Sequence, residues 1–171
     1  AGPGITDAGL MHLAKLHALE RFTIGDTAGV NGSGLAALAG AEALTVLHLS
    51  HVKSLTNEGL RGLAKLTQLG ELSLPPQTTH AVLAHIAGLV NLHELNLDET
   101  QITDVGLAHL AKLQNLEILY LAKTQLTDEA VPYLTPLKQL SSVSLEETQV
   151  TAGAKEKLKQ SFPEGHFILI Y

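Results

Sequence analysis

The stretch LHELNLDETQITDVGLAHLAKLQN, residues 92–115, decides the fold of this chain because it is repeated. The following residues 116–139, LEILYLAKTQLTDEAVPYLTPLKQ, fill the same positions with similar side chains. Six such units begin with corresponding leucines, at spacings of 25, 25, 23, 24 and 24 residues: Leu19, Leu44, Leu69, Leu92, Leu116 and Leu140. A period of this length predicts a solenoid, in which each unit stacks on its neighbours and covers their apolar side chains.

Each unit combines a strand with a helix. At the start of a unit the apolar residues alternate, as at Leu95 and Leu97, and this period of two predicts a short strand. Later in the unit Leu107, Leu110 and Leu113 have helical spacing and predict about two to three turns of helix. The expected fold is therefore α/β, with a concave parallel sheet that is open to solvent and short helices on the convex side.

A polar column separates the strand from the helix in each unit. Thr or Asn recurs where the helix should begin and predicts N-caps, at Thr6, Asn31, Thr56, Thr79, Thr103, Thr127 and Thr151. Acidic residues follow at Asp7, Asp104 and Asp128, where negative charge suits the positive end of the helix dipole. Glycines recur two positions further on, and we expect them to make room for a neighbouring helix, at Gly9, Gly34, Gly59 and Gly106.

The pattern L-x-x-L-x-L-x-x-T-x-[IL]-T-D-x-G-L-x-x-L-x-x-L, from Ile5 to Tyr171, resembles the leucine-rich-repeat superfamily. Its T-D-x-G-L segment is most similar to the ribonuclease-inhibitor-like and F-box-associated cysteine-containing classes. The cysteine-free form, with Thr100, Thr124 and Thr148 after the strand, is similar to repeat domains of bacterial proteins. The resemblance implies a leucine-rich-repeat horseshoe that recognises a protein or other ligand on its concave face. Since the usual Asn after the strand is missing, an internal ladder would use Thr hydroxyls or be weaker.

The domain organisation is predicted from the regularity of the pattern. Residues 1–4 are expected to be a leader or the remnant of a longer chain, residues 5–163 the repeats, and residues 164–171 a C-terminal capping strand. Aligned 24 residues beyond the last unit, Phe167 replaces Val143 in this capping strand. The same alignment places Leu169 at the position of Leu145 and Glu164 where a leucine is expected.

Turn lengths differ among the first three units. The first two full units have one extra residue after the strand, and the third is one residue short. Its turn contains Pro75 and Pro76, which cannot donate hydrogen bonds to a neighbouring strand. The third strand must therefore end at or just before Pro75.

The residues between the leucines of each strand should face the concave surface. Tyr120 is the only aromatic residue in the central column of this face, and Ile118 lies on the same face of the strand. Large amphipathic side chains of this kind are typical of interface hot spots, although a surface tyrosine can also fall here by chance. The predicted partner-binding residues are Tyr120, Ile118, Asn96, Glu94, Glu71, Asp98, Glu99 and His48.

The predicted concave columns contain most of the negative charge. They hold nine acidic residues and two basic ones, whereas the rest of the chain has eight acidic and nine basic residues, for a net charge of −6. This asymmetry predicts a protein partner with a basic surface and argues against nucleic acid. A merely solubilising acidic surface, which protects the open strands from aggregation, is the alternative. The acidic residues are Glu20, Asp26, Glu71, Glu94, Asp98, Glu99, Glu117, Glu146 and Glu147, and the basic residues are Arg21 and Lys123.

Other classes of function have little support in the sequence. There are no cysteines, no uninterrupted apolar run long enough to span a membrane, and no G-x-S-x-G or H-E-x-x-H motif. His48, His51, Glu71 and Asp98 could approach one another, but their spacing fixes no metal geometry. We therefore expect a monomeric protein-recognition module without catalysis, cofactor, metal or membrane partner. The alternative is a structural spacer in a larger protein, and the sequence assigns no compartment.

Overall fold

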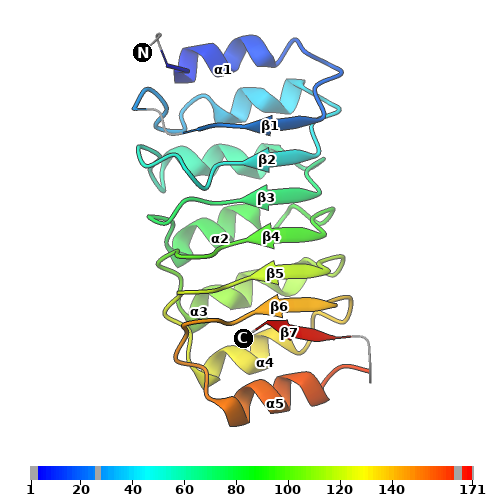
Figure 1. Cartoon of the computed structure of the whole chain (residues 1–171). Coiled ribbons are helices and arrows are strands. Elements are labelled where there is room, and N and C mark those ends of the chain that lie inside the picture. Colours follow the sequence, from blue (N-terminus) through cyan, green and yellow to red (C-terminus); the bar gives the residue numbers. More distant parts are fainter. Residues whose placement is uncertain (1–3, 26–27, 164–166, 171) are drawn as a thin grey trace.

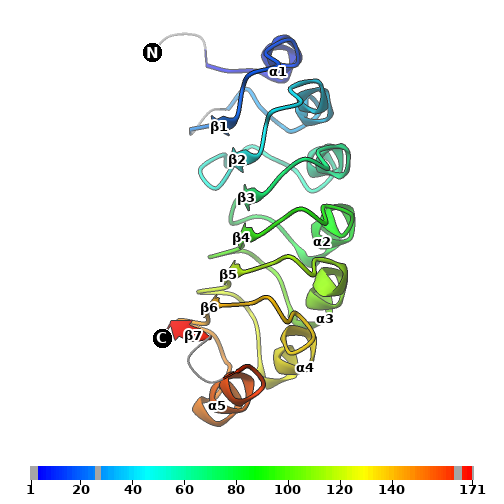
Figure 2. The same cartoon turned by 90° about the vertical axis from the view of Figure 1, so that its right-hand side faces the viewer.

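The computed structural model describes residues 4–25, 28–163 and 167–170. In this part of the chain, strands form one parallel sheet whose spatial order follows the sequence (Figure 1). Helices cover one face of the sheet, and the other face is open (Figure 2). The strands are β1 (Arg21–Thr23), β2 (Val46–His48), β3 (Glu71–Ser73), β4 (Glu94–Asn96), β5 (Ile118–Tyr120), β6 (Ser142–Ser144) and β7 (Ile168–Ile170).

The helical layer mixes α-helices with 3-10 helices, whereas the sequence predicts helices without this distinction. A 3-10 helix rises about 2.0 Å per residue against about 1.5 Å in an α-helix, so fewer residues span the same repeat. No helix in the described residues is long and apolar enough to cross a membrane. The helices are α1 (Asp7–Leu13), η1 (Leu35–Gly40), η2 (Gly59–Lys65), α2 (His80–Ile86), α3 (Asp104–Leu107), η3 (Ala108–Lys112), η4 (Asp128–Ala130), α4 (Val131–Leu134) and α5 (Ala152–Gln160).

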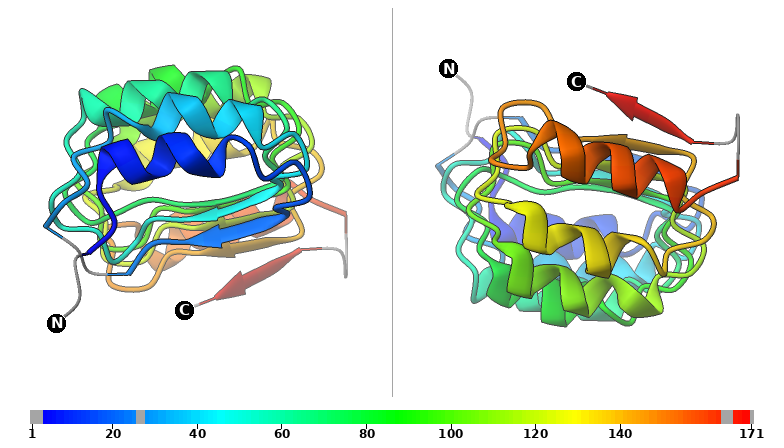
Figure 3. Two further views of the ribbon diagram at one scale, coloured as in Figure 1. Left: turned by 90° about the horizontal axis from the view of Figure 1, so that it is seen from above. Right: turned by 90° about the horizontal axis from the view of Figure 1, so that it is seen from below.

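The core lies between the sheet and the helices, where the repeated leucines meet (Figure 3). The leucines predicted to be buried in the fourth unit are all 0% exposed, at Leu95, Leu97, Leu107, Leu110 and Leu113. On the other face of the same strand, Glu94 and Asn96 are half-buried, and His93 just before it is exposed. The predicted inner and outer positions of the strand are therefore confirmed.

The strands pair in the register that the repeat predicts. Glu71 of β3 pairs with Glu94 of β4, and Glu94 pairs with Ile118 of β5. The central column is likewise continuous, because Asn96 pairs with Tyr120. Residues from different repeats thus form straight rows across the concave face, which is the arrangement needed for a shared binding surface.

The last strand corrects the predicted alignment by two residues. Leu169 of β7 pairs with Val143 of β6, whereas the 24-residue period places Phe167 at that position. A shift by two leaves every side chain on its original face, so Leu169 still points into the core. The longer repeat coincides with a longer helix, since α5 has 9 residues whereas η4 and α4 have 3 and 4. Beyond α5, the rings of Phe162 and Phe167 stack with their centroids 4.3 Å apart. Within the predicted capping segment, residues 164–166 and 171 lie outside the described residues.

The Thr column provides helix caps at several of the predicted positions. The hydroxyl oxygens of Thr6 and Thr151 accept hydrogen bonds from backbone N–H groups three residues later. Thr127 accepts one from Glu129. The caps predicted at Asn31 and Thr56 were wrong, because the N-cap of η1 is Gly34 and that of η2 is Glu58. Thr56 nevertheless accepts a hydrogen bond from the N–H of Gly59. Thr79 and Thr103 stand at N-cap positions without such a bond, and Asn31 accepts from Ser33 just before η1.

The aspartates of this column connect successive repeats, a role beyond the predicted interaction with the helix dipole. Asp104 accepts hydrogen bonds from the backbone N–H of Thr127 at 2.9 Å and from its hydroxyl at 2.8 Å. Asp128 makes the same two bonds to Thr151, at 2.7 and 2.9 Å. Bonds to a charged acceptor are shorter and stronger than neutral ones, so these carboxylates join adjacent units firmly.

The threonines after the strands do not form the internal ladder that the sequence suggests. The hydroxyls of Thr100 and Thr124 each donate to a carbonyl three residues earlier in their own repeat, at 2.6 Å. Thr148 does the same at 2.9 Å. Of the two alternatives, a ladder of Thr hydroxyls between repeats is therefore wrong for these three residues, because a short hydroxyl reaches its own turn before it reaches the next one. The alternative of a weaker ladder is left.

Glycines allow the helical layers to approach closely, as predicted. A Cβ added at Gly34 would collide with the carbonyl of Asp7, and one at Gly59 would collide with the carbonyl of Asn31. At Gly106 an added Cβ would lie 2.6 Å from the Cβ of His80. Gly9 differs, since the nearest atom to an added Cβ would be Oγ1 of Thr6, at 3.7 Å. The glycine is thus required where the chain at or just before the start of the preceding repeat's helix packs against it.

Candidate functional site

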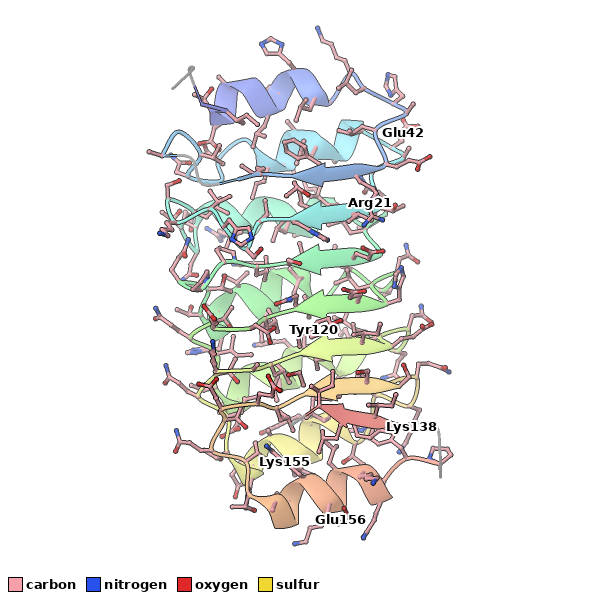
Figure 4. All side chains as sticks on the ribbon, in the orientation of Figure 1. Arg21, Glu42, Tyr120, Lys138, Lys155 and Glu156 are labelled. Carbon is pink, nitrogen blue, oxygen red and sulfur yellow. The ribbon has the colours of Figure 1, made fainter. Side chains whose placement is uncertain are left out.

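The centre of the concave face is formed by two neighbouring strands. Tyr120 lies on β5 (Figure 4). Ile118 is on the same strand, and the residues of β4 that pair with these two are Asn96 and Glu94. All four residues are half-buried, because adjacent strands hold their side chains side by side. We refer to these four residues as the concave patch.

Two further predicted residues lie on the N-terminal side of the concave patch. The Oε2 atom of Glu71 lies 3.3 Å from the guanidinium of Arg21 and 3.9 Å from Nε2 of His48. Its negative charge is therefore partly balanced, unlike that of Glu94, which makes no ion pair among the described residues. In the same part of the chain, no three His, Asp or Glu side chains could hold a metal ion together.

The remaining two predicted residues form the turn after β4. Asp98 accepts a hydrogen bond from the backbone N–H of Ala122 at 2.7 Å, and its own N–H donates to Asn96 at 3.0 Å. Glu99 has a φ of 62° in the left-handed region, and its carboxylate lies 3.0 Å from Nζ of Lys123. The equivalent Lys123 and Glu147 also have positive φ, so the turn geometry repeats.

Burial and negative charge change the acidity of two residues at this site. Burial raises the pKa of Asp98, and the neighbouring carboxylates of Glu99 and Glu146 act in the same direction. The hydrogen bond from Ala122 and the charge of Lys123 oppose this change. Burial also raises the pKa of the Tyr120 hydroxyl, with further contributions from Glu94 and Asp98.

The concave face has an apolar end that the predicted site did not include. Ile168 and Ile170 of β7 continue the two columns beyond Ser142 and Ser144, and they are 65% and 37% exposed. Ser144 is nevertheless buried, since it lies between Tyr120 and Ile170 in the central column. The alternation of residues 168–170 could have predicted this apolar end from the sequence. Both the 24-residue alignment and the observed register, two residues further on, place Ile168 and Ile170 on the concave face.

A second feature absent from the sequence-based site is a hollow at the carboxyl ends of the strands. It has a volume of about 620 Å³ and is open to solvent. We call it the loop-end hollow. Leu74 and Pro76 line it between the turn after β2 and the turn after β4, and its other lining residues are Gly25, Ser50, His51, Lys53, Asn96, Asp98 and Glu99. Three predicted binding residues therefore border a cavity as well as the concave face.

Comparisons with known proteins agree with this architecture. The family model described as "Leucine Rich repeats (2 copies)" matches residues 90–129. The solved structure of internalin C2 from Listeria monocytogenes is similar, with a TM-score of 0.64 and 25% sequence identity. The match covers 97% of this chain and 76% of the internalin chain. No curated protein matches the sequence significantly.

The open parallel sheet, the short helices and these matches define a leucine-rich-repeat solenoid. Domains of this kind generally mediate protein–protein interactions and are typically not enzymes.

Proposed function

We propose that the concave patch binds a protein partner through Tyr120 and Ile118, with the surrounding carboxylates directed toward a basic surface of that partner. The observation on which this rests is the pairing of Tyr120 and Ile118 with Asn96 and Glu94 in fixed register. A large side chain that is already held by its neighbours loses little conformational entropy when a partner covers it.

Each part of the concave patch has a distinct role in this proposal. Tyr120 offers an aromatic ring for apolar contact and a hydroxyl for a hydrogen bond, which is the combination typical of interface anchors. Glu94 is half-buried beside it and has no cation within ion-pair distance among the described residues. A cationic side chain of the partner would supply that missing counter-charge and accelerate association.

The test is capture of partners from the source organism with wild-type protein and three variants. We expect Tyr120→Ala to weaken binding by about 1–2 kcal/mol or more, because truncation of an anchor removes most of its contact. Glu94→Lys should slow association, and the effect should diminish at high salt. Tyr133→Ala on α4, at the helical side, is the matched control and should leave binding unchanged.

Two results would contradict the proposal. Equal losses for Tyr120→Ala and Tyr133→Ala would mean that the concave patch is not the contact. A wild-type protein that retains no partner at all would favour the structural spacer instead. Glu94 is a more suitable position for charge reversal than Glu99, because reversal at Glu99 would also remove its ion pair with Lys123.

The remaining parts of the proposal concern class and assembly. The net charge of −6 disfavours nucleic acid as a partner, and we infer a monomer without membrane association. We also propose that the repeats belong to the ribonuclease-inhibitor-like or F-box-associated cysteine-containing-like class, in its cysteine-free bacterial form, which the T-D-x-G-L segment supports. Sedimentation across a range of protein concentrations tests the monomer, because a dimer would show a concentration-dependent mass.

A further inference from the structure

The loop-end hollow results from unequal turn lengths in three successive repeats. The turn after β2 has one extra residue, whereas the turn after β3 is one residue short and contains Pro75 and Pro76. Leu74 and Pro76, at the short turn, line the hollow between the two neighbouring turns. The spacing returns to 24 residues from β4 to β5 and from β5 to β6, so the unequal turns belong to the earlier repeats.

The two sides of the loop-end hollow have opposite charge. His51 and Lys53 line it from the turn after β2, and Asp98 and Glu99 line it from the turn after β4. Strands two positions apart in a sheet are separated by about 10 Å. In agreement with this separation, no ion pair joins the two sides among the described residues.

Several polar atoms of the hollow have no partner in the described part of the chain. Lys53 makes neither a hydrogen bond nor an ion pair there. Asp98 uses Oδ1 to accept from Ala122, which leaves Oδ2 as an acceptor. Asn96 uses its amide oxygen to accept from Asp98, which leaves its NH₂ group as a donor. Asp98 can thus bind a cation and Lys53 an anion, on the two sides of the exposed Pro76.

We propose that the loop-end hollow binds a short extended peptide segment with one basic and one acidic side chain in succession. The basic side chain interacts with Asp98, and the acidic side chain interacts with Lys53. Successive side chains of an extended segment point in opposite directions, so a Lys-Glu pair reaches both sides at once. The methylene groups of the lysine cover the exposed ring of Pro76.

This inference rests on the proposed function and names one chemical feature of the partner. The hollow adjoins the concave patch through Asn96, which lines the hollow and pairs with Tyr120. A partner that covers Tyr120 can therefore reach the hollow with a neighbouring segment. Complementarity to both signs of charge differs from the purely basic partner that the overall charge suggests.

The experiment uses the whole chain and blocked dipeptides, and it needs no protein partner. Amide chemical shifts of ¹⁵N-labelled protein are followed by NMR during titration with N-acetyl-Lys-Glu-amide. Probes with a single charged side chain, N-acetyl-Lys-Gln-amide and N-acetyl-Gln-Glu-amide, are titrated in parallel. We expect millimolar binding that shifts the amides of Ser50, Lys53 and Asp98, with affinity about threefold to fivefold higher for the doubly charged probe.

Variants assign the two charges to their sides. Lys53→Gln should remove the preference for the acidic side chain, and Asp98→Asn should remove the preference for the basic one. Asp98→Asn keeps an acceptor for the N–H of Ala122, so the turn is preserved. Lys112→Gln and Glu129→Gln, both exposed on the helical side, are matched controls and should change nothing.

Specific outcomes would overturn the proposal. Equal binding of all three probes, or no shift at the hollow, would exclude recognition of a dipolar segment. Free alanine is titrated in parallel with the blocked dipeptides. If free alanine binds at the hollow and the blocked dipeptide does not, a peptide is excluded as the ligand. Tyr120→Ala should leave dipeptide binding intact even where it abolishes partner capture, so failure of the concave patch and failure of the hollow are distinguishable.

Discussion

Between Thr103 and Thr151, neighbouring repeats are joined by the same pair of Asp–Thr hydrogen bonds at each junction. Between Asn31 and Thr79, by contrast, the polar groups that join neighbouring repeats differ from one junction to the next. In the earlier region the backbone N–H of Thr56 donates to the carbonyl of Asn31 at 3.2 Å. At the following junction, the amide of Asn57 donates to the hydroxyl of Thr79 at 3.0 Å.

This difference shows which features of a repeat are needed for stacking and which can vary. Leucines at corresponding strand positions, such as Leu47 and Leu119, are equally buried in both regions. The polar junctions and the turn lengths differ, and the family model matches residues 90–129, within the part of the chain where the spacing is regular. The apolar columns thus define the solenoid, while the junctions adjust how tightly neighbouring units are joined.

The largest effect should come from the shared core. Leu47→Ala in β2 and Leu119→Ala in β5 should each lower the free energy of unfolding by about 2–5 kcal/mol, because both side chains are fully buried. Urea denaturation followed by circular dichroism measures the loss, and hydrogen exchange should show it spreading to adjacent repeats. A cost below about 1 kcal/mol at either position would mean that the two regions do not share one core.

The junctions should differ in strength. Asp104→Ala removes a charged acceptor from Thr127 and should cost about 1.5–3 kcal/mol, whereas Asn57→Ala removes neutral bonds and should cost about 0.5–1.5 kcal/mol. Asp104→Asn should cost less than Asp104→Ala, because an amide can form the arrangement already seen at Asn57. Thermal denaturation of the three variants decides this, and equal losses for both alanine variants would contradict it.

A single buried hydroxyl in the third unit should be replaceable with a gain in stability. Thr78 is 0% exposed and its hydroxyl has no hydrogen-bond partner in the described residues, while the equivalent Ile102 is apolar. Thr78→Val keeps the shape and should raise the free energy of unfolding by about 0.5–1.5 kcal/mol. The reverse change, Ile102→Thr, should destabilise. Unfolding in urea measures both, and a loss for Thr78→Val would show that the hydroxyl is satisfied in solution.

The smallest expected change in the free energy of unfolding depends on pH and concerns Asp98 in the turn after β4. Because the fold raises the pKa of Asp98, its protonated form favours the folded state, and that contribution is lost as pH rises through the raised pKa. Asp98→Asn should therefore be more stable than wild type at pH 7, by no more than about 0.5 kcal/mol, and should show no advantage below its ordinary pKa of 3.8.

The matched control for this pH dependence is Glu117→Gln, which removes one negative charge from an exposed position. Melting temperatures between acidic and neutral pH provide the comparison. A gain for Asp98→Asn that is the same at every pH, or that Glu117→Gln reproduces, would mean that burial of the Asp98 carboxylate is not its cause.

Much of the binding surface could be predicted because side-chain direction in a strand alternates strictly. Glu94, Asn96, Ile118 and Tyr120 follow from the positions of the leucines, and the structure brings them together in the expected rows. The ion pair between Glu71 and Arg21 could not be predicted in the same way, since the two residues are 50 positions apart in the sequence. The binding roles of Glu94, Asn96, Ile118 and Tyr120 remain predictions.

The sequence by itself determined the repeat, the parallel order of the strands and the inner or outer face of each strand residue. These features depend on the period of apolar residues, which is a local property of the chain. The tertiary structure decided the Asp–Thr junctions, the two-residue shift at β7 and the loop-end hollow. Each of these depends on where one repeat lies against the next. The effect of a turn that is one residue longer or shorter depends on the turns of the adjacent repeats.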